Sequence, residues 1–305
     1  MDCRITLPPC WVGANEFEDA LRRSDTPPHD SRVFSVLIEF PTQCKVMVDA
    51  AIRLLSLANQ LDQCTKRVRL SFEEGETGTM GYLNRMGFFD NLSRGVEVIP
   101  DWPSTSGKRR YGGRNVSLVE IERINRNHRD EMLPTRLTDS IMRSCGDRQD
   151  APDLNGAAWT IFAELIDNVF SHSDTPLDGY AALQVYSGGG HVRVAVSDSG
   201  LGIMQTLRPA LKSEFPKLAG LTDAELLVEI FRQGVSRHGS NRGCGLKGCA
   251  AKAIKFKADL DVRMPRNRVQ LIPAHGTYQV NTAYCQNELP LLWGTHLCFK
   301  ILLKA

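Results

Sequence analysis

The chain has 305 residues, more than one typical hydrophobic core holds, so two domains are expected. Hydrophobic residues make up 42% of it and charged residues 24%, as in an ordinary globular protein. The 37 basic and 35 acidic residues leave a net charge of +2, which favours neither nucleic acid nor a membrane surface as a partner. No run of about eighteen apolar residues occurs, so we expect no membrane-spanning helix.

Residues 1–30 are rich in Pro, Asp and Arg and predict an irregular arm with one short helix near Glu16–Arg23. Beyond this arm, strands alternate with helices, which predicts a small α/β domain over residues 31–100. Its strands are expected at 33–40, 67–72 and 96–99, and its helices at 45–61 and 80–92. This order of elements resembles STAS-type domains, α/β modules that regulate bacterial ATP-binding kinases. The resemblance implies that a protein partner binds here.

A linker with connector helices is expected over residues 101–154. Pro, Gly, Ser and charged residues dominate its first part, 100–114, where four basic side chains lie near Tyr111: Lys108, Arg109, Arg110 and Arg114. We interpret this stretch as a solvated loop, with contact to an acidic partner or nucleic acid as the alternative. Helical spacing of apolar residues continues over 116–144, with an interruption at Pro134.

The segment 157–173, AAWTIFAELIDNVFSHS, is long and apolar enough to predict a helix. Glu164, Asn168 and His172 are spaced by four and therefore share one face of that helix. Burying polar groups without partners costs free energy, so this stripe either lines a site or faces water.

The segment 192–203, VRVAVSDSGLGI, predicts a strand that ends at Asp198. Gly200 and Gly202 follow, and such small residues let the backbone approach a ligand closely. A carboxylate at the end of a strand can accept a hydrogen bond from an exocyclic amine. An ordinary tight turn is the alternative, since DSG is common in turns.

Gly243, Gly245 and Gly248 form the pattern GxGxxG in the sequence GCGLKG, which leads into the predicted helix Leu246–Phe256. Glycines at a helix N-terminus expose backbone N–H groups to phosphate, and the helix dipole adds to this attraction. The surrounding sequence has neither the Rossmann pattern nor a Walker A loop. Downstream, Gly294 and Thr295 open the last predicted strand.

Further strands are expected at 180–187 and 191–197, joined by Gly188–Gly190, and at 259–264, 267–274 and 277–282. They predict an α/β sandwich over residues 155–305, with a mixed sheet and helices on one face. Thr222 and Glu225 predict a capping box at the start of a helix through Phe231.

In their order, ELIDN at 164–168, DSGLG at 198–202, GCGLKG at 243–248 and Gly294–Thr295 resemble the four boxes of the GHKL superfamily. This superfamily includes type II topoisomerase ATPase subunits, heat-shock chaperones, MutL-type repair proteins and histidine kinases. The resemblance covers about half of the chain, residues 155–305, and implies a Bergerat-type pocket for ATP and Mg²⁺.

The resemblance implies a role for each matching position. Asn168 would bind Mg²⁺, and Glu164 would act as general base toward water. Asp198 would hydrogen-bond the adenine amino group, with support from Thr295. Backbone at Gly200 and Gly202 would approach the base and ribose.

The phosphate contacts would come from the third box: Gly243, Gly245, Leu246, Lys247 and Gly248. Lys247 departs from the family, which usually has a small or apolar residue there, so it either contacts phosphate or points to solvent. His172 and Arg242 would add contacts to the nucleotide, Arg242 when the lid over residues 203–242 closes. A solvated basic loop is the alternative for the lid residues Arg237, His238 and Arg242.

Two classes of function follow from this reading. In the first, the chain is an ATPase or a protein kinase of the GHKL type with a role in signalling. His128 matches the phosphoacceptor pattern of histidine kinases poorly, because Arg129 replaces the acid and Pro134 is one residue too far away. A serine kinase of the anti-sigma-factor type stays open. In the second class, ATP changes the surface offered to a partner with little or no turnover.

The nine cysteines are scattered without a CxxC pair. Cys244 and Cys249 lie closest together, where unused or buried thiols are favoured over a zinc site. Unpaired thiols, and an N-terminus without a signal pattern, predict a cytoplasmic protein. Nothing in the sequence distinguishes a monomer from a homodimer.

Overall fold

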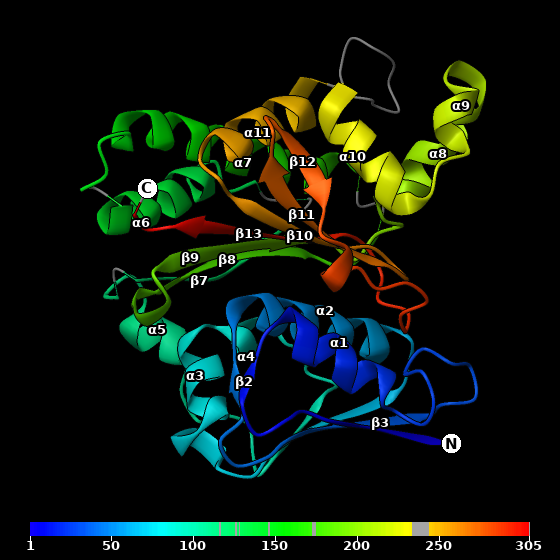
Figure 1. Cartoon of the computed structure of the whole chain (residues 1–305). Helices are drawn as coiled ribbons and strands as arrows, with labels where there is room; N and C mark the ends of the chain where they lie inside the picture. The colour runs from blue at the N-terminus through cyan, green and yellow to red at the C-terminus, as the bar shows by residue number, and fades with distance from the viewer. Residues whose placement is uncertain are drawn as a thin grey trace.

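The protein is described by a computed structural model that covers residues 1–115, 117–125, 127, 129–145, 147–172, 175–233 and 244–304. Within these residues, two main sheets lie one above the other with helices between them (Figure 1). The smaller sheet has four parallel strands in the order β1-β3-β5-β6, and the larger has seven in the order β12-β11-β10-β13-β9-β8-β7. The predicted α/β class is confirmed.

The parallel sheet is built from β1 (Asp2–Thr6), β3 (Ser35–Phe40), β5 (Arg67–Phe72) and β6 (Glu97–Ile99). A separate two-stranded parallel sheet is formed by β2 (Trp11–Val12) and β4 (Lys45–Val46). The irregular arm predicted over residues 1–30 is wrong for its first residues. Cys3 and Ile5 alternate with exposed polar residues and are buried, and this period of two seats β1 beside β3.

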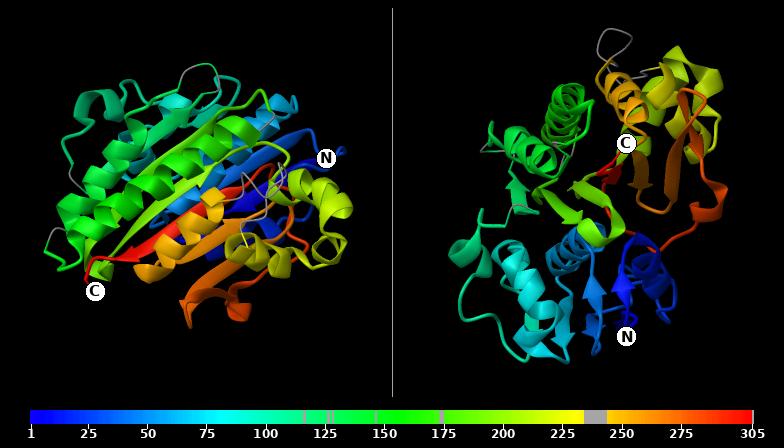
Figure 2. Two further views of the ribbon diagram at one scale, coloured as in Figure 1. Left: turned by 90° about the horizontal axis from the view of Figure 1, so that it is seen from above. Right: turned by 60° about the vertical axis from the view of Figure 1, so that its left-hand side comes forward.

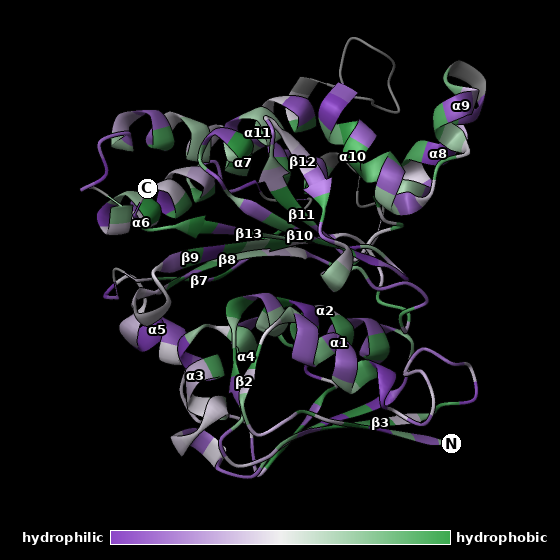
Figure 3. Ribbon diagram, viewed as in Figure 1, coloured by the Kyte–Doolittle hydropathy of each residue, from purple (hydrophilic) through white to green (hydrophobic). Residues whose placement is uncertain are grey.

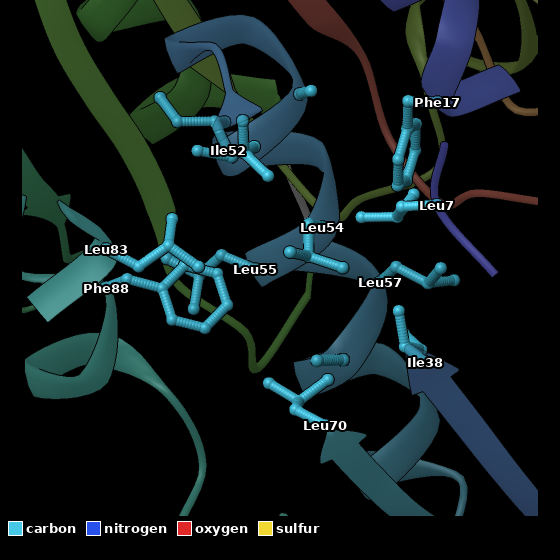
Figure 4. Packing of buried hydrophobic residues seen from close by; sticks show 14 of the residues in the cluster. Leu7, Phe17, Ile38, Ile52, Leu54, Leu55, Leu57, Leu70, Leu83 and Phe88 are labelled. Atoms are coloured by element: carbon cyan, nitrogen blue, oxygen red, sulfur yellow. The ribbon is translucent and has the colours of Figure 1, made fainter. Parts of the chain in front are cut away.

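The helices of the N-terminal half are α1 (Ala14–Arg22), α2 (Val48–Gln63), α3 (Thr79–Arg85), α4 (Phe88–Asn91) and α5 (Gly107–Tyr111), with a 3-10 turn at Gly75–Thr77. Helix α2 is buried along nearly its whole length. Figure 4 shows its apolar side chains packed on two neighbours: Leu55 points toward Leu83 and Phe88, and Leu57 toward Ile38. The helix predicted over 80–92 is divided at Gly87, whose φ of +80° is not helical.

The large sheet contains β7 (Leu118–Ile124), β8 (Gly179–Tyr186), β9 (His191–Ser197), β10 (Asp259–Arg263), β11 (Arg268–Ala274), β12 (Thr277–Val280) and β13 (His296–Leu302). Every strand pairing that it shows within the described residues is antiparallel, although a mixed sheet was predicted. Tight connections join β8 to β9, β10 to β11 and β11 to β12, and each reverses the chain, which accounts for three of these pairings. The pairings β7–β8, β9–β13 and β10–β13 are antiparallel across longer connections.

One face of the large sheet carries α6 (Leu133–Cys145), α7 (Ala151–His172), α10 (Asp223–Gln233) and α11 (Cys244–Lys255) (Figure 1). Helices α8 (Ile203–Glu214) and α9 (Pro216–Ala219) extend from one end of it, and 3-10 turns occupy Ser187–Gly189 and Thr282–Tyr284. The predicted capping box is confirmed: Thr222 N–H donates to Glu225 Oε2 at 2.9 Å, and Glu225 N–H donates to Thr222 Oγ1 at 3.3 Å.

The helix predicted over 116–144 is wrong in its first part. Residues 118–124 form β7, the edge strand of the large sheet, and the helix α6 begins only at Leu133. Leu118 and Ile121 pack against the N-terminal half, and Val119 and Ile124 pack on the helical face. A register shift between Val119 and Glu122 allows residues an odd number of positions apart to share a face of this strand. Residues 101–154 therefore contribute a strand and a helix to the large-sheet layer.

The second face of the large sheet lies against α2 (Figures 1 and 2). Tyr180, Ala182, Ala195 and Cys298 belong to the same hydrophobic cluster as the core of the N-terminal half. The large sheet is therefore buried on both faces, with helices on one side and the parallel α/β unit on the other.

Candidate functional site

The neighbouring strands β9 and β13 bring Asp198 and Thr295 together. Ser197 pairs with His296, so the next residue along β9 faces the one that precedes β13. Asp198 N–H donates to the Thr295 carbonyl oxygen at 3.0 Å, and Thr295 N–H donates to Asp198 Oδ2 at 3.2 Å. Gly200 N–H donates to Asp198 Oδ1 at 2.7 Å. These bonds fix the carboxylate in one orientation at the end of the sheet.

Burial raises the pKa of Asp198 to about 6, against the opposing effect of the hydrogen bonds from Gly200 and Thr295. Each carboxylate oxygen accepts one of these backbone bonds and keeps capacity for another donor. The group is therefore a fixed acceptor for an amino group placed beside it.

Two glycines with positive φ lie near the Asp198–Thr295 pair, and one of them, Gly294, contacts Asp198 itself. Gly294 has a φ of +88°, and a methyl group on it would overlap the Asp198 carbonyl oxygen and lie 2.7 Å from Asp198 Oδ1. Gly202 has a φ of +84°, and a methyl group there would lie 2.8 Å from the Pro265 ring. Beside them, Thr295 Oγ1 accepts from Ile203 N–H at 3.0 Å, which caps the first turn of α8.

A second group of predicted residues lies where α7 meets the start of α11. Glu164 and Asn168 are half-buried on α7. A methyl group on Gly245 would overlap the Glu164 carboxylate, whose Cδ would be 2.9 Å away. Glu164 therefore packs against the beginning of α11. The alternative prediction, in which the polar stripe of this helix faces only water, is wrong for this residue.

The last turns of α7 adjoin the end of β9. A methyl group on Gly179 would lie 2.5 Å from Val169 Cγ1 and 2.7 Å from the Ser197 carbonyl oxygen. Val169 follows Asn168, and Ser197 precedes Asp198, so the residues of the first and second predicted boxes come from adjoining backbone.

Helix α11 begins at the same end of the sheet. It leads into β10, whose last residue, Arg263, pairs with His296 at the start of β13. Twelve residues of α-helix span about 18 Å, close to the length of these strands, so α11 runs back over the sheet and starts near Thr295. Figure 1 shows this course above the sheet.

The remaining residues of the predicted phosphate loop differ in their surroundings. Lys247 is exposed, Leu246 packs partly against the core beneath α11, and a methyl group on Gly248 would enter open space.

Gly243 and Arg242 lie outside the described residues, as do Arg237, His238 and His128. Of His172, only the backbone at the end of α7 is described.

The oxygen donors of this region suit a hard cation. The Asn168 amide and the Glu164 carboxylate supply oxygen, and Mg²⁺ typically takes one or two protein ligands together with phosphate and water. Among the described residues, no group of three or more His, Cys, Asp or Glu side chains could hold a metal ion.

Cys249 is buried, and burial raises its thiol pKa to about 12, which fits an unused thiol better than a zinc ligand.

The basic stretch near Tyr111 forms the short helix α5, which is hydrophilic in Figure 3. Lys108 is not merely solvated: its Nζ donates to the Ile121 carbonyl oxygen at 2.7 Å and to Glu122 at 3.0 Å. Together with β7 and α6, this helix lines a cavity of about 550 Å³. Its lining includes five basic and four acidic side chains, so the two signs of charge are nearly balanced.

One residue near the site has no counterpart among the predicted ones. Gln60 of α2 bonds to Ser199 and Trp293, which flank the Asp198–Thr295 pair. The polar positions of α2 are spaced by three and four, which is the same signal that singled out α7. On α2 this signal was hidden within a strongly apolar helix.

Comparison with known proteins adds a distant structural likeness. No protein-family model matches the chain, and no curated protein matches it. Among solved structures, the B subunit of DNA gyrase from Myxococcus xanthus aligns over 57% of this chain with 11% identity and a TM-score of 0.23. The alignment spans 43% of that subunit, less than half of its length. Such values are too low to indicate a function.

Among the described residues, no helix is long and apolar enough to cross a membrane.

Proposed function

We propose that the chain binds Mg-ATP at the end of the large sheet where β9 ends and β13 begins. The observation that carries this proposal is the Asp198 carboxylate, which backbone N–H groups of Gly200 and Thr295 hold at 2.7 and 3.2 Å. An adenine amino group would donate to this carboxylate, whereas the carbonyl of guanine at the same position would be repelled. The pocket would therefore select ATP over GTP.

The phosphates would lie at the start of α11. Backbone N–H groups in the first turn of this helix have no partner within the helix, and its dipole favours negative charge. Mg²⁺ would be held by Asn168 and by phosphate oxygens, and when bound it would neutralise phosphate charge. Gly245, which leaves space for the Glu164 carboxylate, supports placing a general base beside the terminal phosphate.

Hydrolysis or transfer of the γ-phosphate is the activity that this arrangement supports best. Glu164 would accept a proton from the attacking water or hydroxyl group. The regulatory role, the cytoplasmic location and a protein partner at the N-terminal half belong to the same proposal. The second candidate, a nucleotide-gated interaction module with little turnover, is supported by the packing of α2 directly against the large sheet.

Calorimetry with Mg-ATP carrying a γ-labelled phosphate tests the proposal in one sample. Binding with release of labelled phosphate would identify an ATPase, and label on the protein would identify a kinase. Binding without either would favour the nucleotide-gated module. No binding would overturn the proposal.

Substitution of Glu164 tests the general base. Glu164→Ala should lower turnover by about 100-fold or more while ATP affinity changes little, because the base acts on the reaction and not on adenine. The matched control is Asp167→Ala on the same helix, where the half-exposed carboxylate pairs with Arg129 at 2.9 Å. Turnover should survive in the control. Full turnover in Glu164→Ala would remove Glu164 from the mechanism.

A further inference from the structure

Helix α2 of the N-terminal half presents a stripe of polar side chains to the large sheet. The stripe consists of Asp49, Arg53, Ser56 and Gln60, spaced by four, three and four residues so that they share one face. All are buried, with relative exposures of 3%, 1%, 0% and 0%. Buried polar side chains need partners. Arg53 bonds to Glu18 of α1, and other partners of the stripe lie about 140 to 230 residues further along the chain, in the large-sheet half.

Gln60 is the member of the stripe that reaches the nucleotide end of the sheet. Its Nε2 donates to Ser199 Oγ at 2.9 Å and to the Trp293 carbonyl oxygen at 3.1 Å. Its Oε1 accepts from Trp293 N–H at 2.9 Å. The side-chain amide therefore pairs with the backbone of Trp293 on both sides and holds Ser199 beside it.

These contacts flank the adenine-recognition pair. Ser199 follows Asp198 directly, and Trp293 stands two residues before Thr295. Gly294, between Trp293 and Thr295, has a φ of +88° and lies against the Asp198 carboxylate. A shift of Trp293 would therefore move Thr295 N–H away from Asp198 Oδ2, and a shift of Ser199 would move the other backbone donor, Gly200 N–H.

A second residue of the N-terminal half supports the same segment. The His29 ring packs against the Trp293 ring with their centroids 5.4 Å apart. The Trp293 backbone and ring are thus both contacted by residues that precede the large sheet in sequence, Gln60 and His29.

We propose that Gln60 is a positioning residue for nucleotide binding: it clamps the segments 198–200 and 293–295 so that Asp198 and Thr295 keep the geometry that adenine recognition needs. This inference rests on the proposed function. It makes the N-terminal half a structural part of the nucleotide pocket. Displacement of α2 would then alter nucleotide affinity.

The test replaces Gln60 by methionine, which keeps the volume and removes the hydrogen bonds. Gln60→Met should weaken binding of Mg-ADP and of adenosine by the same factor, about tenfold or more, because the base end of the pocket is loosened. In ligand-free protein, amide hydrogen exchange should become faster in residues 199–203 and 293–296.

Asn59→Leu is the matched control. Asn59 neighbours Gln60, is 7% exposed, and also makes three hydrogen bonds within the described residues, to the Asn91 carbonyl oxygen, Tyr180 Oη and Ser93 N–H. Those partners lie away from the two clamped segments. The control should lower the melting temperature in a comparable way without selective loss of adenosine affinity or faster exchange at 199–203 and 293–296.

The outcomes separate the two proposals. Adenosine affinity and exchange that match wild type in Gln60→Met would overturn this inference while leaving the proposed function intact. Absence of nucleotide binding by the wild-type chain would overturn the proposed function and this inference with it. If Gln60→Met fails to fold, Ser199→Ala removes one clamp bond from the opposite side. A weaker adenosine affinity in that variant supports the clamp, and an unchanged affinity contradicts it.

Discussion

At the scale of single residues, Asp198 is subject to two opposing effects. Burial disfavours its charged form, whereas the backbone donors Gly200 and Thr295 favour it. Burial is the larger effect, and it raises the pKa of Asp198 to about 6. The raised pKa means that the carboxylate destabilises the folded chain as pH increases from the unfolded value near 4 through 6. A side chain that opposes folding at neutral pH is expected where it serves a ligand.

The pH dependence of nucleotide affinity follows from this pKa. Only the ionised carboxylate accepts at both oxygens, so affinity for adenosine, which carries no phosphate that titrates near pH 6, should be constant well above pH 6 and fall about tenfold per pH unit below it. Titration calorimetry between pH 5 and 8 measures this dependence. Asp198→Asn should bind weakly with a flat profile over the same range. A wild-type profile without a step near pH 6 would contradict the assignment of Asp198 to the base.

The residues of the candidate site differ in how far sequence could identify them. Asp198 and Glu164 are proposed from sequence, since each belongs to a short motif whose residues adjoin in sequence. Gln60 was not predictable from motifs, because its partners Ser199 and Trp293 are 139 and 233 positions away. Spacing marks a polar stripe on a helix, but only the tertiary fold identifies the surface that the stripe meets.

At the scale of elements, local pattern decided most assignments correctly. The helices α2 and α11 and the β8–β9 hairpin were predicted within a few residues of their ends, whereas α7 begins at Ala151, six residues before the predicted start and inside the predicted linker. The strand β7 was mistaken for a helix because both of its faces are covered by other parts of the chain. Apolar side chains therefore occur on both faces, which obscures the alternation of apolar and polar residues that marks a half-buried strand. β1 was missed because its short alternation lies among prolines and charges.

The contact between α7 and α11 makes a prediction about Gly245. Alanine there would favour the helix by up to about 1 kcal/mol, but its methyl group would displace the flexible end of Glu164. We therefore expect Gly245→Ala to keep its melting temperature and to lose turnover by about 100-fold. Thermal unfolding and phosphate release measure the two effects separately.

Gly156→Ala provides the control for that experiment, because Gly156 lies on α7 with nothing within 4 Å of an added methyl group. It should raise stability by up to about 1 kcal/mol with full turnover. If Gly245→Ala also kept full turnover, the position of Glu164 against α11 would have no catalytic meaning.

At the scale of the whole molecule, a buried ionic network joins the two halves of the chain. Glu18 of α1 lies between Arg53 of α2 at 3.2 Å and Arg263 of β10 at 2.9 Å, and all three side chains are at most 1% exposed. Asp261 of β10 pairs in turn with Arg53 and with Arg268 of β11. Charges buried this deeply are tolerated only when they are paired, so neither half can expose this seam without a large free-energy cost.

The network predicts that the chain unfolds as one unit. Glu18→Ala would leave two buried guanidinium groups short of a partner and should lower the free energy of unfolding by about 3–5 kcal/mol. Scanning calorimetry should show one transition in wild type and in the variant, because the seam and the shared hydrophobic cluster couple both halves.

Glu97→Gln is the control: its pair with Arg67 at 3.2 Å is exposed, so the expected loss is at most about 1 kcal/mol. Two separate transitions, with only the first shifted by Glu18→Ala, would mean that the N-terminal half folds independently, and the clamp at Gln60 would then have to act across a mobile interface.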